Sequence, residues 1–463
     1  MKNKFILCSV GASLAFSCGL IAQNEAPAKP AKPPVQKDKN AEWFTNALKG
    51  KTSTPAPSKV LTAEEVTNTL PQLLASYKKA AITQGWDKQL MKNPPVFDGK
   101  GRPKVSAAIL EQDGKKMPYT IIVRGEKPKN GYPLFISMHG GGKYHGEEKV
   151  GPHGWSVNSR EWQTQMHFAL KGIYKPAGVY FIPRMADDNL GRWWHAFNIK
   201  IFKTMISRAV LFNEVDPNRI YMMGISQGGY GSCHLGPFMA DHLAAVGPMA
   251  GGMMTVTENL RNLPFRSDIG ENDTAYNRIK LAKELHAKLD EHKAKDPKGF
   301  VNELAIQKGR GHGIDYSKNP VWLAKHTRNP YPEKILWRCH QKQGLYADSF
   351  YWLSLSSTPE KGEYSITATI NKKSNSVEIT ATEIIPPADK EKESTKKPLK
   401  SSDIIVHLND KMLDLNKVVT IKLNGKTSFK GKVERNLSTM MQNLAKRKDI
   451  NYAFPASIIL KAK

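Results

Sequence analysis

A serine flanked by glycines follows a run of apolar residues, in the sequence GISQG at 224–228. Glycines on both sides allow the chain to turn sharply from a strand into a helix, which exposes the serine hydroxyl at the end of the strand. A hydroxyl is a poor nucleophile unless a neighbouring base takes its proton. The pattern therefore predicts that Ser226 is a catalytic nucleophile, provided that the chain supplies a base and an acid.

The base is sought among the histidines after Ser226, because such turns have their partners in the order serine, acid, histidine. These histidines are His234, His242, His286, His292, His312, His326, His340 and His407. The first two are too close to Ser226 for a strand and an acid to intervene, and we expect the next two on the surface of a lysine-rich helix. His312 lies in the glycine loop GRGHG directly after the apolar segment 303–307. This position favours His312 as the general base.

The acid is expected on the loop that follows the preceding strand. The sequence FRSDIGENDTAYNR (265–278) offers Asp268, Glu271 and Asp273. We expect Asp268 to lie within the strand, and Asp273 follows Gly270 just before a helical pattern begins. The sequence therefore favours Asp273 as the acid, with Asp268 in reserve. The alternative for Asp273 is a purely structural role as the N-cap of that helix.

Donors for an oxyanion are predicted at two places. The sequence HGGG (139–142) follows the apolar run 134–138, and glycines there can direct backbone N–H groups toward a developing negative charge. The amides of Gly140 or Gly141, together with the amide of Gln227 after the nucleophile, are the predicted donors. His139 is expected to support the loop. The alternative is a flexible glycine loop without a catalytic role.

Two adjacent tryptophans, Trp193 and Trp194, precede a long helical pattern. Their flat rings could line a pocket for an acyl group or a sugar. Packing in the core at the start of a helix explains them equally well, so both interpretations stay open here.

Strand and helix patterns alternate between about 105 and 330, where several strands are apolar on both faces, as in buried parallel sheets. The alternation predicts an α/β fold, an open and mostly parallel sheet with helices on both faces. Before it, Thr62 and Glu65 stand at capping-box spacing, and Pro71 is expected to begin a second helix. After it, 331–463 shows alternating and β-branched segments, with Asn424 and Gly425 as a hairpin signal. A small antiparallel β-rich, sandwich-like domain is expected there.

The segments HGGG, VDPNRIYMMGISQGGYG, IGENDTAYNR and GRGHG together resemble the α/β-hydrolase superfamily over roughly 105–330. Within it they are similar to secreted esterases of the polyhydroxybutyrate depolymerase, feruloyl esterase and acetyl xylan esterase branch. The resemblance implies Ser226 as nucleophile, Asp273 as acid and His312 as base. DPNRIYMMG is also similar to prolyl-oligopeptidase-like peptidases, although no propeller precedes the domain. The loop 143–162 and the β-rich tail depart from the simplest esterases and would shape specificity.

The first 22 residues combine Lys2 and Lys4 with an apolar stretch and end in Ala22, which is typical of a signal peptide. Residues 23–60 are rich in proline and lysine and are expected to form an extended linker, so that order begins near Leu61. A secreted or periplasmic protein without a stable membrane span is predicted, and a lipid anchor at Cys18 is a lesser alternative. In the mature chain, Cys233 and Cys339 could form one disulfide or remain two buried thiols.

The 463 residues carry a formal net charge of +27. The lysines are scattered and no nucleic-acid-binding module is recognisable, so no nucleic acid partner is expected. The motifs favour an exported serine hydrolase that cleaves carboxylic esters, including esters linked to a polysaccharide or polyester, without a metal or organic cofactor. A serine peptidase and a non-catalytic surface binding protein are the alternatives.

Overall fold

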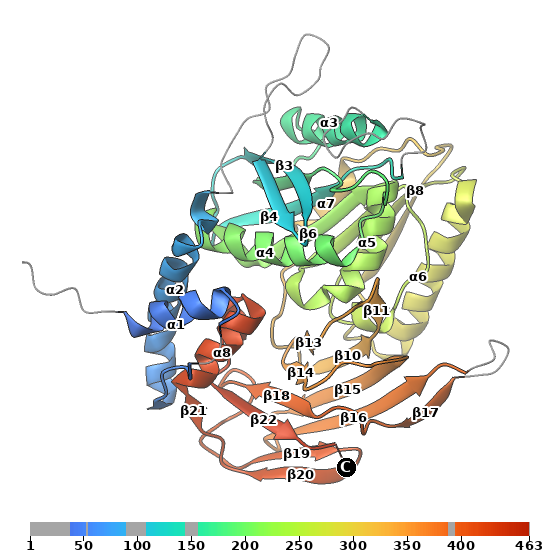
Figure 1. Cartoon of the computed structure of the whole chain (residues 1–463). Coiled ribbons are helices and arrows are strands. Elements are labelled where there is room, and N and C mark those ends of the chain that lie inside the picture. Colours follow the sequence, from blue (N-terminus) through green and yellow to red (C-terminus); the bar gives the residue numbers. More distant parts are fainter. Residues whose placement is uncertain (1–37, 52–53, 89–107, 144–155, 388–393, 463) are drawn as a thin grey trace, which may run out of the picture. The chain divides into compact units, whose positions relative to one another are not determined.

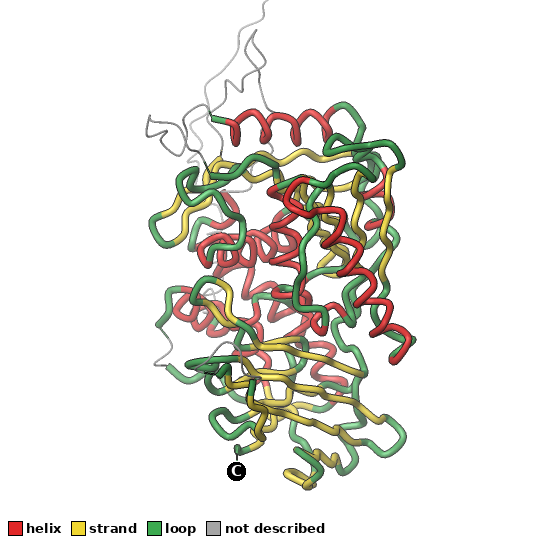
Figure 2. The backbone as a smooth tube through the Cα atoms, turned by 90° about the vertical axis from the view of Figure 1, so that its right-hand side faces the viewer, coloured by secondary structure: helices red, strands yellow, loops and turns green. Residues whose placement is uncertain are grey.

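The computed structural model describes residues 38–51, 54–88, 108–143, 156–387 and 394–462. The predicted signal peptide, residues 23–37 and 52–53 of the predicted linker, and residues 144–155 of the loop 143–162 lie outside these ranges. Residues Lys39–Lys463 form one compact unit, drawn in Figures 1 and 2. Among the described residues, no helix has the length and apolar character needed to cross a membrane.

Order begins earlier than the predicted Leu61. Helix α1 (Lys39–Leu48) lies within the predicted linker and buries Trp43 and Phe44, which pack against Tyr77 of the next helix, α2 (Ala63–Thr83). Two buried aromatic rings outweigh the proline- and lysine-rich character of the flanking segments. Short elements β1 (Val60–Leu61) and η1 (Trp86–Lys88) border α2.

Helix α2 begins with the predicted capping box, but it continues past the residue at which a second helix was expected. The Thr62 side chain accepts from the Glu65 amide at 3.1 Å, and the Glu65 carboxylate accepts from the Thr62 amide at 2.8 Å. Pro71 does not begin a second helix, because α2 continues through it to Thr83. The buried face of α2, which includes Leu73 and Tyr77, holds the helix together across the backbone hydrogen bond that proline cannot make.

An eight-stranded sheet forms the centre of the molecule, in the order β2-β3-β5-β4-β6-β7-β8-β9. β2 and β3 form an antiparallel hairpin, β3 pairs antiparallel with β5, and the remaining neighbours are parallel. The strands are β2 (Ala108–Gln112), β3 (Lys115–Arg124), β4 (Tyr132–Met138), β5 (Gly178–Pro183), β6 (Val215–Ile225), β7 (Ala245–Met249), β8 (Phe265–Gly270) and β9 (Asn302–Gln307). The predicted mostly parallel sheet is thus confirmed.

Helices cover both faces of this sheet (Figure 1). Leu134 and Ile136 of β4 pack in one core with residues of α4, α5 and α6, whereas Phe135 between them packs in a second core with residues of α3 and α7. This alternation is the two-residue period of a strand that is buried on both sides. The helices are α3 (Val157–Leu170), α4 (Ala196–Phe212), α5 (Gln227–Phe238), α6 (Arg278–Lys295) and α7 (Lys318–Leu323).

The C-terminal region consists of two main sheets, as the sequence indicated. The larger has the order β10-β15-β16-β19-β20 with β17 beside β16, and the smaller has the order β13-β14-β18-β22. Their strands are β10 (Lys334–Cys339), β13 (Ser349–Phe350), β14 (Leu353–Leu355), β15 (Glu363–Asn371), β16 (Ser376–Ile385), β17 (Thr395–Pro398), β18 (Ile404–Leu408), β19 (Val419–Leu423), β20 (Lys426–Gly431) and β22 (Ala456–Leu460). Asn424 and Gly425 have φ of 49° and 79° in the predicted tight turn. The pairing is antiparallel except between β16 and β19, which are parallel.

Smaller elements complete this region. Helix α8 (Leu437–Arg447) is capped by the side chain of Asn436. Strands β11 (Gln341–Lys342) and β12 (Leu345–Tyr346) pair with each other, and β21 (Arg435–Asn436) pairs with β1. The two cysteines of this unit, Cys233 and Cys339, are free and buried. Burial raises the pKa of both thiols to about 12, which keeps them protonated.

Buried ion pairs join the C-terminal region to the turn between α5 and β7 and to the segment after α7. Arg447 of α8 lies 2.5 Å from the Asp241 carboxylate, and the Asp241 carbonyl accepts from Arg328 at 2.7 Å and from the Tyr452 hydroxyl at 2.6 Å. Arg328 also pairs with Asp449 at 2.7 Å. The four charged side chains are at least nine-tenths buried, so each depends on its partners for the solvation that it has lost.

Replacing Asp241 with alanine is therefore expected to lower the free energy of unfolding by about 3–5 kcal/mol, because it leaves Arg447 buried without its counter-charge. Urea unfolding of the full chain measures this loss. Asp414→Ala is the control, since its pair with Lys417 is exposed and should contribute little to stability. Equal losses in the two variants would contradict a structural role for the buried cluster.

Candidate active site

Ser226 stands at the turn between β6 and α5, with φ 54° and ψ −110°. A side chain at positive φ is strained, and such strain is retained where the surroundings fix the backbone. The flanking glycines allow the required close approach. A Cβ at Gly224 would lie 2.4 Å from the backbone of Gly228, and a Cβ at Gly228 would lie 2.2 Å from the carbonyl oxygen of Met138. The sequence pattern thus has its predicted cause in the packing of strand against helix.

The structure brings the three predicted triad residues together. His312 Nε2 lies 3.0 Å from Ser226 Oγ, and His312 Nδ1 lies 2.8 Å from Asp273 Oδ2. An ionised carboxylate only accepts hydrogen bonds, so the proton is on Nδ1 and the Nε2 lone pair faces the serine hydroxyl. The His312 side chain is 46% exposed while that of Asp273 is 2% exposed. The predicted base is therefore exposed to solvent, and the predicted acid is shielded from water.

Asp273 is held by more than its histidine. Its second carboxylate oxygen accepts from Arg278 at 3.0 Å, and Arg278 Nε donates to the Tyr230 hydroxyl at 2.7 Å. The side chain is not the N-cap of α6, because that helix begins at Arg278 and its flanking residue is Asn277. The reserve acid Asp268 is directed elsewhere, since it accepts from Arg266 at 2.7 Å and from Asn319 at 2.8 Å.

The loop with His312 is fixed to the loop with Asp273 by contacts that the sequence did not indicate. The Gly309 amide donates to the Glu271 carboxylate at 2.8 Å, and the Asn272 amide donates to the Arg310 carbonyl at 2.8 Å. Gly270 allows this approach, because a Cβ there would lie 2.0 Å from the Gly311 carbonyl oxygen. His312 and Asp273 are thus positioned by one pair of interlocked loops.

The predicted oxyanion donors lie beside Ser226. A Cβ built on Gly140 would be 3.4 Å from the Ser226 Cβ, so the HGGG loop passes next to the serine. Gln227 is the first residue of α5, and the first amides of a helix have no partner within it. Gly142 is excluded as a donor, because its amide donates to Asn158 Oδ1 at 2.8 Å. Asn158 also donates to the Gly142 carbonyl at 2.8 Å, a support that no sequence signal revealed.

His139 supports the same loop from behind. Its Nδ1 is 2.5 Å from the Gly140 carbonyl, and its Nε2 accepts from the Met185 amide at 2.9 Å. The Trp193 indole donates to the His139 carbonyl at 3.1 Å and is fully buried. Trp193 is thus part of the core behind the loop. Trp194 is half-buried, with its ring centroid 4.0 Å from that of His234, and its contact with a substrate stays a prediction.

Two charged side chains near the nucleophile were not singled out from the sequence. Arg192 Nη1 lies 3.4 Å from the Gln227 side-chain oxygen, and its guanidinium lies 5.8 Å from the centre of the Trp194 ring. The Glu161 carboxylate would be 3.2 Å from a Cβ on Gly140. Both come from segments that precede the serine in the chain, where the search for triad partners does not look.

Several buried or half-buried histidines stay neutral at neutral pH. Burial lowers the pKa of His139, His234 and His407 to about 3 and that of His242 to about 4. His286, expected at the surface, is also buried, with its ring nitrogens 2.7 Å from Asn302 and 2.9 Å from Ser267. The helical pattern alone did not reveal which of its faces meets the sheet.

These histidines predict a loss of stability in mild acid. Their pKa values are lower in the folded than in the unfolded chain, so the unfolded chain binds more protons between about pH 6.5 and 4. The contribution of these histidines to the free energy of unfolding is fully present above about pH 6.5. It decreases as the pH falls, by up to about 1.4 kcal/mol per pH unit for each histidine. Urea unfolding at pH 7 and pH 5 checks the sign. His407→Gln should reduce the slope, and an unchanged free energy of unfolding at pH 5 would contradict the prediction.

No family model matches the sequence, and no curated protein matches it. Similar solved structures include a thermostable esterase (18% identity, 51% of this chain and 71% of that chain, TM-score 0.36) and a ferulic acid esterase (15%, 48% and 97%, TM-score 0.34). A third is the poly(3-hydroxybutyrate) depolymerase LpqC from Bordetella parapertussis (11%, 48% and 92%, TM-score 0.34). The chain has the α/β-hydrolase fold. Two features of the chain identify this fold: the strand order of the central sheet and the serine turn at the end of β6.

Proposed function

We propose that this α/β-hydrolase is an exported serine hydrolase that cleaves carboxylic esters through an acyl-enzyme. The observation that carries the proposal is the continuous hydrogen-bonded chain from Ser226 through His312 to Asp273, with the serine on a strained turn. A hydroxyl in that arrangement has a base within reach, and the base has a carboxylate that orients it and stabilises its charge.

The chemistry follows from the geometry. Ser226 Oγ attacks the ester carbonyl while His312 Nε2 takes the hydroxyl proton, and the tetrahedral oxyanion is bound by the amides of Gln227 and of Gly140 or Gly141. His312 then gives the proton to the alkoxide oxygen, so the alcohol leaves and the acyl group stays on Ser226. A water molecule, deprotonated by His312, attacks the acyl-enzyme, and the carboxylic acid leaves as Ser226 regains its proton.

Export is proposed from the basic and apolar character of residues 1–22, with cleavage after Ala22. N-terminal sequencing of the protein recovered outside the cytoplasm tests this point. A mature chain that begins at Gln23 would support it, whereas recovery of the uncleaved chain in the cytoplasm would refute it.

A fluorophosphonate probe tests the nucleophile, because it reacts with activated serines and is blind to the leaving group. We expect labelling of the wild-type chain at Ser226, and no labelling of Ser226→Ala. An unlabelled wild-type chain would favour a non-catalytic binding protein. p-Nitrophenyl esters of increasing acyl length, compared with aminoacyl p-nitroanilides, test the bond that is cleaved. Faster cleavage of the anilides would reassign the protein as a peptidase.

A further inference from the structure

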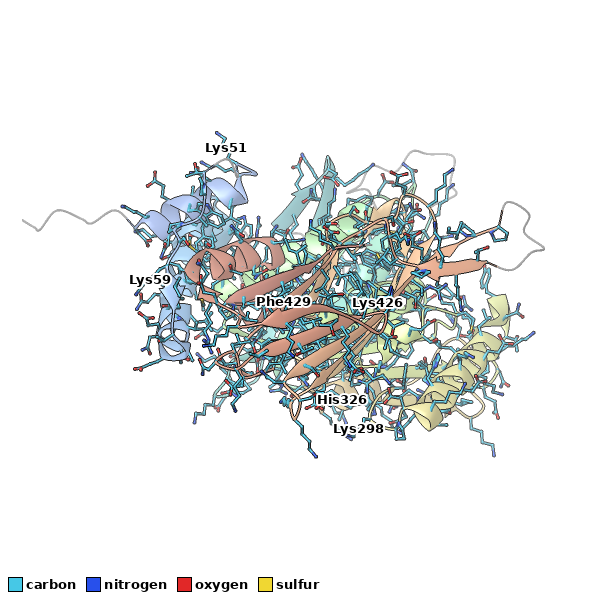
Figure 3. The ribbon with its side chains drawn as sticks, turned by 90° about the horizontal axis from the view of Figure 1, so that it is seen from below. Lys51, Lys59, Lys298, His326, Lys426 and Phe429 are labelled. Atoms are coloured by element: carbon cyan, nitrogen blue, oxygen red, sulfur yellow. The ribbon has the colours of Figure 1, made fainter. Side chains whose placement is uncertain are left out.

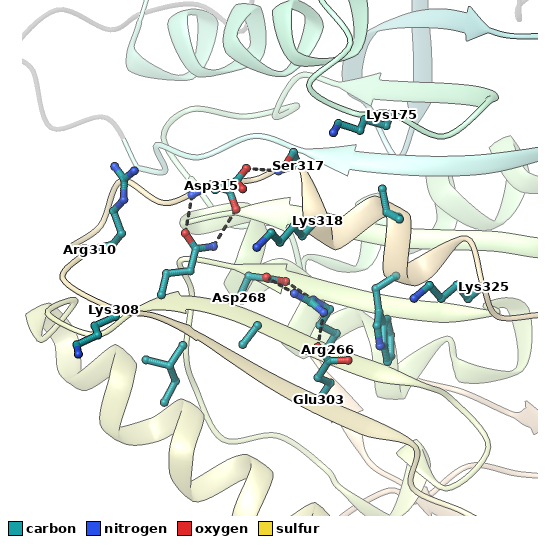
Figure 4. A pocket seen from close by; sticks show the side chains of 15 residues that line it. Lys175, Arg266, Asp268, Glu303, Lys308, Arg310, Asp315, Ser317, Lys318 and Lys325 are labelled. Carbon is teal, nitrogen blue, oxygen red and sulfur yellow. Dashed lines mark hydrogen bonds and ion pairs between the residues drawn. The ribbon is translucent and has the colours of Figure 1, made fainter.

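An open groove of about 1000 Å³ runs along β9, the edge strand of the central sheet, and under α7. Figure 4 shows the side chains that surround it. The lining residues are Lys175, Arg266, Asp268, Glu303, Ala305, Ile306, Gln307, Lys308, Arg310, Asp315, Ser317, Lys318, Val321, Trp322 and Lys325. They come from the turn before β5, from β8 and β9, from the loop that holds His312 and from α7, so distant segments build one surface.

The groove is predominantly basic. Arg266 on its floor is balanced by Asp268 at 2.7 Å and Glu303 at 2.5 Å. The other cations are exposed, and within the described part of the chain none of them makes an ion pair; they are Lys175, Lys308, Arg310, Lys318 and Lys325. Asp315 lies among them, and its carboxylate accepts from the Ser317 amide at 2.9 Å. Cations gathered without partners in a hollow attract an anionic ligand.

The remaining lining indicates what kind of anion fits. Ile306 and Val321 are 41% and 38% exposed, so the groove also presents apolar surface beside its lysines. The Gln307 side chain is held by the Asp315 backbone, since its Oε1 accepts from the Asp315 amide at 2.7 Å and its Nε2 donates to the Asp315 carbonyl at 2.8 Å. The Asp315 and Glu303 carboxylates only accept hydrogen bonds. A ligand complementary to this surface carries negative charges, hydroxyl donors and C–H faces at once. DNA lacks the hydroxyl donors that these carboxylates could accept from.

We propose that this groove binds an acidic polysaccharide, through the carboxylate or sulfate groups along its chain. The lysines pair with those groups, the carboxylates accept from sugar hydroxyls, and Ile306 and Val321 contact the C–H faces of the rings. The loop 308–315 forms one wall of the groove while His312, in its middle, faces Ser226. If the ester that the enzyme cleaves is attached to this polymer, an inference that rests on the proposed function, the groove holds the chain beside the catalytic residues.

Binding is tested without catalysis, by titration calorimetry with the full chain carrying Ser226→Ala. The probes are sodium alginate for carboxylates, dextran sulfate for sulfates, neutral dextran as a blank, and polyadenylate RNA. The groove variant adds Lys175→Gln, Lys318→Gln and Lys325→Gln, none of which lies in the loop with His312. The matched control adds Lys373→Gln, Lys426→Gln and Lys430→Gln, which remove the same charge from exposed positions of the larger C-terminal sheet. Lys426 is labelled in Figure 3.

We expect alginate or dextran sulfate to bind and neutral dextran not to bind. Three lost exposed contacts should weaken binding on the order of tenfold in the groove variant and less than about twofold in the control. The tighter of the two anionic polymers identifies the charged group. Equal weakening in both variants, or binding to neither polymer, would overturn the proposal, and tighter binding of RNA through the same lysines would reassign the groove. Unfolding curves verify that both variants fold. None of these outcomes depends on hydrolysis, so the binding proposal and the proposed activity can be refuted independently of each other.

Discussion

Ser226→Ala is expected to reduce kcat for ester hydrolysis on the order of 10⁶-fold, because the variant has no hydroxyl to form the acyl-enzyme. His312 and Asp273 cannot compensate, since they act on the proton of that hydroxyl. The remaining rate is what the oxyanion donors and substrate binding provide to a water molecule. KM should change little, as the hydroxyl makes only a small part of the contact with the substrate.

The measurement is a progress curve with a p-nitrophenyl ester, at enzyme concentrations high enough to detect single turnovers. Ser232→Ala serves as the control, because Ser232 lies on the same helix with its hydroxyl 3.0 Å from the Gly228 carbonyl. That variant should keep kcat within a few-fold of the wild type. If Ser226→Ala kept most of the activity, or if both variants lost it equally, Ser226 would not be the nucleophile.

The residues that meet at the site could be predicted because each stands at the end of a strand. The end of a parallel strand is marked in the sequence, where an apolar run gives way to glycines or acidic residues, as before Ser226 and His312. Parallel strands bring such ends to one edge of the sheet, so chain order together with its position after Gly270 favoured Asp273 over Asp268. The interlocking of its loop with 309–311 depends on backbone geometry, which residue types do not record.

Other features could not be predicted because they depend on what lies opposite in space. Helix α1 is held by contacts of Trp43 and Phe44 with α2 and α8. The proline-rich residues around it favoured a linker instead of a helix. In the sequence, Asn158 is indistinguishable from other polar helix residues. Its role depends on the hydrogen bond with Gly142, which only the structure shows. The groove at β9 needs Lys175 and Lys325, which lie 150 positions apart. Lysines that are scattered in the sequence form one basic surface because the fold brings them together.

Asp273→Asn is expected to lower kcat on the order of 10⁴-fold while leaving the fold intact. An amide can turn its N–H₂ toward His312 Nδ1 and hold the imidazole with its proton on Nε2, the nitrogen that must accept from Ser226. The asparagine also leaves the imidazolium of the transition state without its counter-charge. Arg278, which donates to Asp273 at 3.0 Å, would then add an unbalanced positive charge beside the histidine. Both effects act on the chemical step, so kcat should change far more than KM.

Asp268→Asn is the control, because it removes a buried carboxylate that does not contact His312. Asp268 is as deeply buried as Asp273 and is also paired with an arginine, yet no described contact joins it to His312. Its replacement is expected to destabilise the chain and to leave kcat of the folded fraction within about tenfold of wild type, because the base keeps its orienting acid. Unfolding curves correct for the folded fraction. If Asp268→Asn abolished turnover while Asp273→Asn did not, the acid would have been assigned to the wrong carboxylate, and the loop after β8 would have to rearrange before catalysis.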